Sequence, residues 1–388
     1  MEKKESTLQS LLVSFGLASV WFGIYIGPGF SGGAQLVSFF VGQSWLGVFI
    51  GPLFTTTVAG IICYLVLEYC RTFELYDFRS FYDRVFGKFN FFFANVKEFS
   101  AILACITISA LTFATGGRLL SEFFHVSSVA MGLLTFGIVA VLILAGQKIV
   151  LKSASFIAIA LIGLIGYIAV RGVPASWEGM SHYVGNRTMN APLSQVLMQI
   201  VLYINIMVAF IDAVIPASKG QVKTRMHSLG TAIIGSLMVF VSTIAMNIIF
   251  AAGMPTVAGE DLPTLWSLNH IIGAGFTVRL LYTAIAYLAV LSTGAGYLYG
   301  MIERYQLLVH KVWKGSGYNA RRILLVVILT VLAFYFGRAG IPQIVTTAYG
   351  IIGRINIPLF EIPFLVILPY QLYKYQKNKI APEIELSE

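Results

Sequence analysis

The stretch from Gly23 to Gln35 holds the residue types best suited to binding a ligand through the backbone. It reads Gly-Ile-Tyr-Ile-Gly-Pro-Gly-Phe-Ser-Gly-Gly-Ala-Gln and lies inside an apolar run from Leu11 to Val41. Glycines leave helical dihedral angles at low cost, while Pro28 removes one N–H group and disfavours the helical region for Gly27. Where such a break lies in lipid, the released backbone groups need protein, water or ligand as partners. The stretch therefore predicts a broken helix with a binding site.

The length of this apolar run also favours a break. Its 31 residues would form a straight helix of roughly 46 Å, whereas the hydrocarbon core of a membrane is about 30 Å thick. Two half-helices that meet near the middle of the membrane fit better. The alternative is a kinked but continuous helix with a glycine-rich packing face, because Gly29 and Gly33 have Gly-x-x-x-Gly spacing.

The composition places the chain among membrane proteins that cross the bilayer many times. Hydrophobic residues make up 57% of the sequence, charged residues only 11%, and the mean hydropathy is +0.82. A soluble domain has no surface for so many apolar side chains. The three cysteines lie in or near apolar segments and predict no disulfide framework. The five histidines have no ligand spacing and no P-loop is present. We expect neither an enzyme nor a cofactor other than a bound ion.

Ten apolar spans and the placement of basic residues predict the topology. With a cytoplasmic N-terminus, 20 of the 26 Lys and Arg residues fall inside and 6 outside, so both termini are expected in the cytoplasm of a cell-membrane protein. This accounts for the net charge of +9 without nucleic acid. The expected spans are 11–41, 46–69, 91–117, 128–146, 150–170, 193–216, 228–253, 274–300, 322–337 and 356–373.

Ten spans divide into two units of five, and an odd unit repeats with inverted topology. The expected fold is therefore an all-α polytopic protein with two inverted five-helix repeats. The predicted divisions are residues 1–171 for the first repeat, 172–192 for an outer loop, 193–373 for the second repeat and 374–388 for a cytoplasmic tail. Shorter helices are expected at 253–273 and 340–355 on the outer side, and an amphipathic one at 71–90 on the inner side.

The sixth span is the counterpart of the first, so it is the place to look for a second break. It contains Tyr203-Ile-Asn205-Ile-Met207, which puts a phenol and an amide at mid-membrane depth but has neither glycine nor proline. We expect a break there. The alternative is a continuous helix whose Tyr and Asn side chains find partners on neighbouring helices.

These two stretches resemble the amino acid, polyamine and organocation transporter superfamily with the LeuT-type fold, and more closely the YkvI-type membrane proteins. The first match is Gly27-Pro28-Gly29-Phe30-Ser31-Gly32-Gly33-Ala34-Gln35 with Phe39-Phe40 behind it, and the second is Tyr203-x-Asn205. The sequence departs from the family pattern in having Gln35 instead of an acidic residue and Gly32 instead of serine. The chain therefore has no carboxylate at the position where the family has one.

The resemblance implies a sodium site between the first and eighth spans. It would consist of the carbonyl oxygens of Gly23, Ile26 and Ala289 and the hydroxyls of Ser292 and Thr293, and neutral oxygens of this kind suit Na⁺. The alternative is that the two hydroxyls bond back to their own helix turn.

The resemblance also implies an alternative to sodium, which is coupling to protons. In proton-coupled relatives a lysine ammonium of the fifth span replaces sodium, and Lys152 matches it here. The alternative is a lysine that extends to the membrane surface. Asp212 is a second candidate for proton coupling, because it and Glu361 are the acids expected deepest in the membrane.

The predicted solute site combines backbone and side chains of the two breaks. The amides from Phe30 to Gly33 begin a half-helix and could hold a carboxylate, because helix N-termini carry partial positive charge. Phe30, Tyr203, Asn205 and Met207 would shape the pocket. The complete expected set is Gly27, Gly29, Phe30, Ser31, Gly32, Gly33, Tyr203, Asn205 and Met207.

The expected function is secondary active transport of a small organic solute, such as an amino acid or related zwitterion, by alternating access and with sodium favoured over protons. One alternative is a non-transporting, permease-like sensor resembling a germinant-receptor component, which alone would require a protein partner. Another is an uncoupled exchanger or uniporter. The remaining expected partners are the solute and the lipid bilayer.

Overall fold

The computed structural model describes residues 7–145 and 147–385, except for the side chains of residues 78, 145, 147–158, 213 and 379–385. This part of the chain is all-helical, as expected, apart from one isolated bridge between Ser44 and Met189. The elements are α1 (Thr7–Tyr25), α2 (Pro28–Ser31), α3 (Ala34–Leu36), the π-helix η1 (Val37–Val41), α4 (Leu46–Phe73), α5 (Phe78–Phe86), η2 (Gly87–Phe89), α6 (Asn90–Phe124), α7 (Ser128–Ala145), α8 (Gln147–Gly185), α9 (Leu193–Ala209), α10 (Ile211–Ala217), α11 (Arg225–Ala252), η3 (Thr256–Gly259), α12 (Pro263–His270), α13 (Phe276–Val312), α14 (Tyr318–Gly337), α15 (Ile341–Asn356), the π-helix η4 (Ile357–Glu361) and α16 (Ile362–Glu385).

Nine helical segments in the described part of the chain are long and apolar enough to cross a membrane. A further apolar helix, Ser128–Leu144, falls just short of that length and corresponds to the expected fourth span. The chain is therefore a multi-pass membrane protein, while the count of ten spans and the inverted repeat stay predictions. The nine segments are Thr7–Tyr25, Leu46–Phe73, Arg79–Phe124, Ile159–Gly185, Leu193–Ala217, Arg225–Ala252, Phe276–Val312, Tyr318–Gly337 and Ile341–Asn378.

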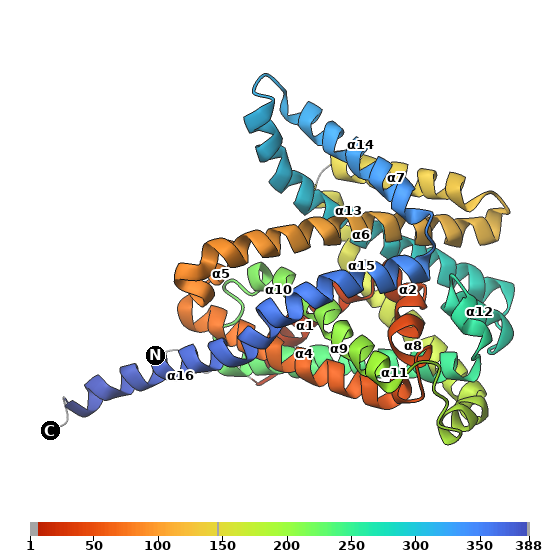
Figure 1. The fold of residues 1–388 in the computed structure, drawn as a ribbon, viewed down its shortest axis with the longest axis horizontal. Coiled ribbons are helices and arrows are strands. Elements are labelled where there is room, and N and C mark those ends of the chain that lie inside the picture. The colour runs from red at the N-terminus through yellow and green to blue at the C-terminus, as the bar shows by residue number, and fades with distance from the viewer. Residues whose placement is uncertain (1–6, 146, 386–388) are drawn as a thin grey trace.

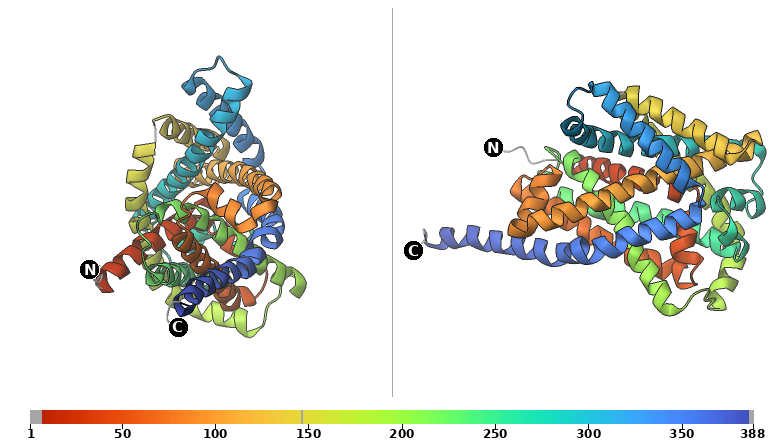
Figure 2. Two further views of the ribbon diagram at one scale, coloured as in Figure 1. Left: turned by 90° about the vertical axis from the view of Figure 1, so that its left-hand side faces the viewer. Right: turned by 45° about the horizontal axis from the view of Figure 1, so that its top comes forward.

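The helices form two groups that lie one above the other in Figure 1. In the lower group α11 packs against α1 and α4, and α4 also packs against α9. In the upper group α6 packs against α7, α13 and α14. Two elements join the groups, since α8 contacts both α11 and α13, and α15 contacts both α9 and α6. The two views in Figure 2 show α16 extending beyond both groups.

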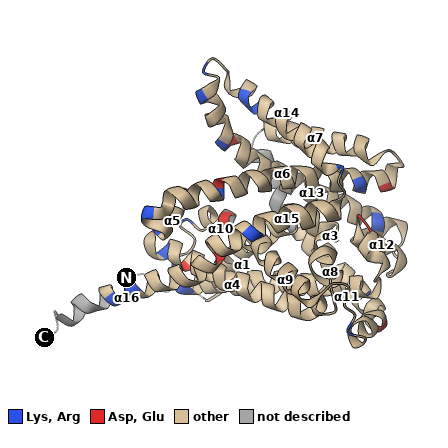
Figure 3. Ribbon diagram, viewed as in Figure 1, with Lys and Arg blue, Asp and Glu red and all other residues tan. Residues whose placement is uncertain are grey.

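The beginning of α1 and the end of α16 lie on the same side of the molecule, which we call the termini side (Figure 1). Figure 3 shows that most Lys and Arg residues lie near the ends of the helices rather than along their middles. This distribution fits helices that cross an apolar layer, because a charged side chain at the centre of a bilayer is costly.

The predicted outer loop at 172–192 is shorter than expected. Helix α8 continues to Gly185, and only the remaining residues are irregular. Sequence reasoning treated Pro174 and the glycines as breakers. Gly179 is instead a point of close packing, because a Cβ atom there would lie 2.9 Å from Cβ of Ala252 on α11.

The predicted short outer helix at 340–355 is wrong as an independent element. Helix α15 continues through η4 into α16, so one long segment begins at Ile341 and Arg354 lies within it. Pro342 stands in the first turn, where proline is tolerated. Gly353 is a packing position, since a Cβ atom there would lie 2.9 Å from Cδ2 of Leu202.

The amphipathic helix expected at 71–90 is present as α5. It begins at Asp77, whose side chain accepts a 2.9 Å hydrogen bond from the backbone N–H of Ser80. The hydrogen bond from the Ser80 side chain lowers the pKa of the Asp77 carboxyl group. On the helix, Phe81 and Tyr82 are buried while Arg79 is exposed.

Candidate functional site

The first span is broken where the glycines and proline predicted it. Helix α1 ends at Tyr25, residues 26 and 27 are bent, and α2 starts at Pro28. The N–H group of Ile26 donates to Phe22 O at 3.0 Å, but no donor in the described part of the chain reaches the carbonyl oxygens of residues 23–26. The end of α1 therefore presents unpaired oxygens inside the protein.

The amides after the break only partly match the predicted carboxylate cradle. Ser31 N–H donates to Gly27 O at 2.9 Å, and Gly33 N–H donates to Phe30 O at 2.9 Å. Gly32 N–H is also used, at 3.4 Å from Pro28 O. Among the expected amides from Phe30 to Gly33, only that of Phe30 has no acceptor among the described residues. The amide of Gly29, which was not in the expected set, has none either. The cradle is corrected to these two groups, because the short α2 turn uses the others.

Two of the glycines lie close to neighbouring segments of the protein. Gly33 has a φ of 89°, and a Cβ atom there would lie 2.7 Å from Cζ of Phe250. The neighbouring Gly32 carbonyl accepts a 3.1 Å hydrogen bond from the amide of Thr264, in the first turn of α12. Gly29 differs, because its missing side chain faces Gln35, whose Oε1 would be 2.6 Å from a Cβ atom.

Tyr203 lies at the centre of a buried polar cluster, which we call the tyrosine cluster. Its hydroxyl shares a hydrogen bond with the hydroxyl of Tyr25 and accepts a 3.1 Å hydrogen bond from Gln35 Nε2. Tyr25 also lies 3.2 Å from Thr243 Oγ1. The Phe30 ring packs on Tyr25 with centroids 4.9 Å apart. The structure therefore brings together Tyr25, Phe30 and Gln35 of the first span, Tyr203 of the sixth span and Thr243 of α11.

Asn205 and Met207 do not join this cluster, and the sixth span is not broken beside them. Helix α9 is continuous to Ala209, and only Phe210 separates it from α10. The side chain of Asn205 accepts a 2.9 Å hydrogen bond from Asn356 on α15. The Met207 carbonyl accepts from Trp21 Nε1 at 3.0 Å. Because neighbouring side chains satisfy the polar groups, the backbone stays helical.

A small cavity lies beside the break. Its volume is about 20 Å³, enough for about one water molecule. Ser31 Oγ is buried without a hydrogen-bond partner, while the Ser31 carbonyl accepts a 2.7 Å hydrogen bond from Tyr282. The lining carries no charged side chain and comes from the first span, α8, α11, α12 and α13, with Ile26, Ser31, Met246, Thr264, Tyr282 and Ala286 among its residues.

Sequence reasoning missed three of these contributors. Tyr25 lies inside the glycine-rich stretch but was given no role, and Tyr282 is another phenol within an apolar span. The reasoning that drew attention to Tyr203, that a buried phenol needs a partner, applied equally to both. Thr264 carried no such signal, because its approach to the break depends on the fold of the loop before α12.

Four of the five oxygens predicted for the cation site have no hydrogen-bond partner within the described residues. Thr293 lies against the break, since a Cβ atom on Gly27 would be 3.1 Å from Thr293 Cγ2. Neither Ser292 nor Thr293 makes a hydrogen bond through its hydroxyl within the described residues, whereas Ser109 Oγ bonds back to Cys105 O at 2.8 Å. The alternative of hydroxyls bonded to their own turn is therefore not what the structure shows. Ala289, one turn earlier on α13, is buried.

Of the two candidates for proton coupling, the structure describes the side chain of Asp212 but not that of Lys152. The side chain of Lys152 lies outside the described residues, so its role stays a prediction. Asp212 is not an isolated acid, because Lys97 Nζ lies 3.0 Å from its Oδ2. Tyr82 also donates to Asp212 Oδ1 at 3.4 Å.

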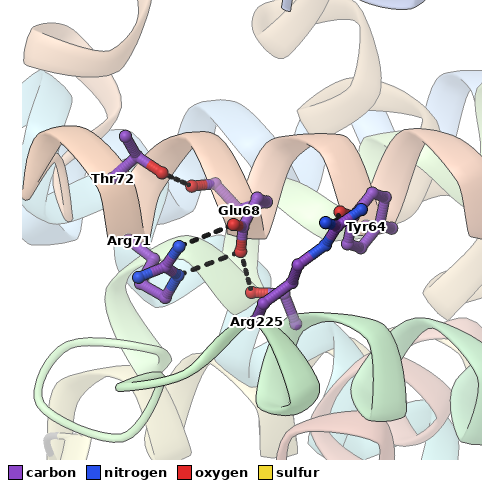
Figure 4. Close-up of polar contacts among 6 residues, drawn as sticks. Tyr64, Glu68, Arg71, Thr72 and Arg225 are labelled. Atoms are coloured by element: carbon purple, nitrogen blue, oxygen red, sulfur yellow. Dashed lines mark hydrogen bonds and ion pairs between the residues drawn. The ribbon is translucent and has the colours of Figure 1, made fainter. Parts of the chain in front are cut away.

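A second charged group ties α4 to α11 on the termini side (Figure 4). Glu68 is 3% exposed and accepts from Arg71 Nε at 2.9 Å and Nη2 at 2.6 Å. Ser228 on α11 donates to Glu68 Oε2 at 3.1 Å. Arg225 points away from this group and donates to Tyr64 at 2.8 Å. This arrangement stabilises one helix pair and is separate from the Lys97–Asp212 pair.

Comparisons with known proteins place the fold but not the family. No protein-family model matches the sequence, and no curated protein sequence matches it. Solved structures do match at low identity. Among them is the inward-facing conformation of Mhp1 (TM-score 0.53, 15% identity, 83% of this chain and 70% of that chain). Two others are the Eremococcus coleocola manganese transporter with an aromatic bis-isothiourea compound (0.57, 13%, 94% and 81%) and the substrate-bound, outward-open Na⁺-coupled sialic acid symporter (0.53, 12%, 92% and 87%). The chain therefore has the LeuT-type transporter fold. The narrower resemblance to YkvI-type proteins stays a prediction.

Proposed function

We propose that this protein is a secondary active transporter that moves a small zwitterion by alternating access around the broken first span. The observation that carries the proposal is the set of unpaired backbone groups at the break. They are four carbonyl oxygens around the end of α1 and two amides at the start of α2. Tyr25, Ile26, Gly29 and Phe30 are buried among them, while Gly23 and Ile24 are half-buried. Unsatisfied backbone groups at this depth are costly unless a ligand or water pairs with them. Two of the structures that share the fold are named as transporters, for manganese and for sialic acid.

The charge balance of the site favours a solute without net charge. The cavity beside the break has no charged residue in its lining, so neither an excess positive nor an excess negative solute would find a counter-ion there. The amides of Gly29 and Phe30 can donate to a carboxylate, and the carbonyls at the end of α1 can accept from an ammonium group. An α-amino acid carries both groups close together. The cavity has to enlarge before such a solute enters.

Sodium is the proposed coupling ion. The carbonyls of Gly23 and Ile26 and the hydroxyls of Ser292 and Thr293 are neutral oxygens without hydrogen-bond partners among the described residues. A hard cation prefers such ligands, and the contact of Gly27 with Thr293 puts the two helices close together. With the Ala289 carbonyl the set reaches five oxygens. A bound cation beside the break would also attract the solute carboxylate.

The test begins with purified protein and a thermal-shift screen of amino acids and small cations, with sodium, potassium and pH varied. The solute that stabilises the protein is then followed into proteoliposomes. Sodium-dependent accumulation supports the proposal. Binding without flux would support a permease-like sensor instead. Flux that follows only the solute gradient would indicate an exchanger or uniporter.

A further inference from the structure

Glu361 is a buried carboxyl group without a partner. It ends the π-helix η4 in the long segment that begins at Ile341, and it is 3% exposed. Neither of its two oxygens has a hydrogen-bond partner in the described part of the chain. By contrast, Glu68 is equally buried but receives three hydrogen bonds from Arg71 and Ser228. An ionised carboxylate with no donor is costly in an apolar interior, so the favourable form of Glu361 is the neutral acid.

The charged residues that act on Glu361 are Lys97 and Asp212. Lys97 Nζ pairs with Asp212 at 3.0 Å and lies 5.2 Å from the ring centre of Phe360, the residue before Glu361. Lys97 is 8% exposed, so it too is enclosed by protein. The other titratable groups around this pair are the phenols of Tyr82, Tyr297 and Tyr349 and the thiol of Cys70. Lys97 is thus the one positive charge within the described surroundings of Glu361.

The three residues come from different parts of the fold. Lys97 is on α6 in the upper group, Asp212 is on α10 beside α1 and α4 in the lower group, and Glu361 is on the segment that touches both. Any rearrangement between the two groups would strain the Lys97–Asp212 pair. Glu361 is the acid available to Lys97 when Asp212 moves away.

The backbone at Glu361 is itself irregular. The turn from Ile357 to Glu361 has π-helical hydrogen bonding, and such turns are frequent at functional sites. One turn earlier Asn356 donates to Asn205 and accepts from Ser100 Oγ at 2.8 Å. Ser100 and Lys97 share one face of α6, three residues apart. Hydrogen bonds therefore link the middle of α9 to Ser100, on the face of α6 that also carries Lys97.

We propose that Glu361 is a proton-binding site, with Lys97 as the counter-ion of its ionised form. In the state described here, Lys97 neutralises Asp212 and Glu361 holds a proton on its carboxyl oxygen. When Lys97 leaves Asp212, it stabilises the Glu361 carboxylate, and the released proton passes to water. Reprotonation from water returns Lys97 to Asp212. The link between this cycle and solute movement rests on the proposed transport function, whereas the binding of the proton does not.

Infrared spectroscopy of the purified protein tests the site without requiring transport. Wild-type protein near neutral pH should show the carbonyl stretch of a protonated carboxyl group, and Glu361→Gln should lack it. The matched control, Glu178→Gln, changes an exposed glutamate and should keep the band. A wild-type spectrum with no band that Glu361→Gln removes would overturn the proposal.

A second pair of variants tests the role of Lys97. Asp212→Asn removes the competing acid, so Lys97 should pair with Glu361 and the band should disappear. Lys97→Gln removes the counter-ion, so the band should persist to higher pH than in wild type. If Asp212→Asn leaves the band unchanged, Lys97 is not the counter-ion. If the spectra agree with the proposal but proteoliposomes show no solute flux, the proposed transport function is wrong and the proton-binding site is supported.

Discussion

The hydroxyl groups of Tyr25 and Tyr203 share a hydrogen bond that joins the last turn of α1 to the middle of α9. Both phenols are buried, at 1% and 0% exposure. Gln35, beyond the break, donates to the same Tyr203 hydroxyl at 3.1 Å. The two sides of the break are therefore held in register by one residue of the sixth span. A solute that binds at the break would act on this link directly.

Tyr203→Phe is expected to destabilise the protein and to weaken solute binding together. The change removes one hydroxyl and leaves Tyr25 and Gln35 without their shared partner, which costs about 1 to 3 kcal/mol for a buried group. Thermal unfolding in detergent, with and without the solute found by screening, measures both effects. Tyr335→Phe is the matched control, because Tyr335 is 72% exposed. Equal stability of the two variants would show that the cluster has no structural role.

The break in the first span could be predicted from sequence because its cause is local. Gly27 and Pro28 limit the backbone wherever the segment lies, so α1 ends beside them in the structure. The sixth span could not be predicted in the same way. Whether Tyr203 and Asn205 break a helix depends on whether neighbouring side chains satisfy them, and Gln35 and Asn356 do.

The difference between local and long-range causes also explains why α8 and α15 extend further than the sequence predicts. Glycine and proline were interpreted as helix ends at 172–192 and at 340–355. In α8 and α15 several of these glycines let another helix approach closely, as Gly353 does for Leu202. A packing glycine and a breaking glycine are identical in one sequence, because the difference lies in a partner helix far along the chain. The ion pair between Lys97 and Asp212 could not be predicted for the same reason, because its two residues lie far apart in the sequence.

Gly29→Leu should abolish solute binding while the protein still folds. A Cβ atom at this position would already lie 2.6 Å from Gln35 Oε1, and a larger side chain would cover the free Gly29 and Phe30 amides. Gly137→Leu is a suitable control, because no atom lies within 4 Å of a Cβ atom there. Solute-induced thermal shifts compare the two. Normal binding by Gly29→Leu would remove the break from the solute site.

The double variant Ser292→Ala and Thr293→Ala tests sodium coupling. It removes two of the five proposed oxygen ligands, and each loss of about 1.4 kcal/mol raises the sodium concentration required about tenfold. Sodium-driven uptake should therefore collapse or need far more sodium, while Lys152→Ala acts weakly. In the alternative outcome, uptake follows a proton gradient in sodium-free buffer and is uncoupled by Lys152→Ala. That result would show that the ammonium group of Lys152 takes the place of sodium.

The predicted orientation places both chain ends in the cytoplasm. A cysteine added after Lys379 should resist a membrane-impermeant maleimide in intact cells and react once the membrane is opened. The three native cysteines are buried and should be replaced first. Labelling from outside intact cells would reverse the orientation inferred from the basic residues.

We propose that the broken first span carries a solute across the membrane. A counterflow experiment measures this transport most directly. Proteoliposomes preloaded with the unlabelled solute identified by thermal shift are diluted into a trace of the same solute in labelled form. Wild-type protein should accumulate the label transiently in sodium buffer, and the Gly29→Leu variant should not. Saturable binding by wild-type protein with no counterflow would contradict the claim and assign the site to a sensor.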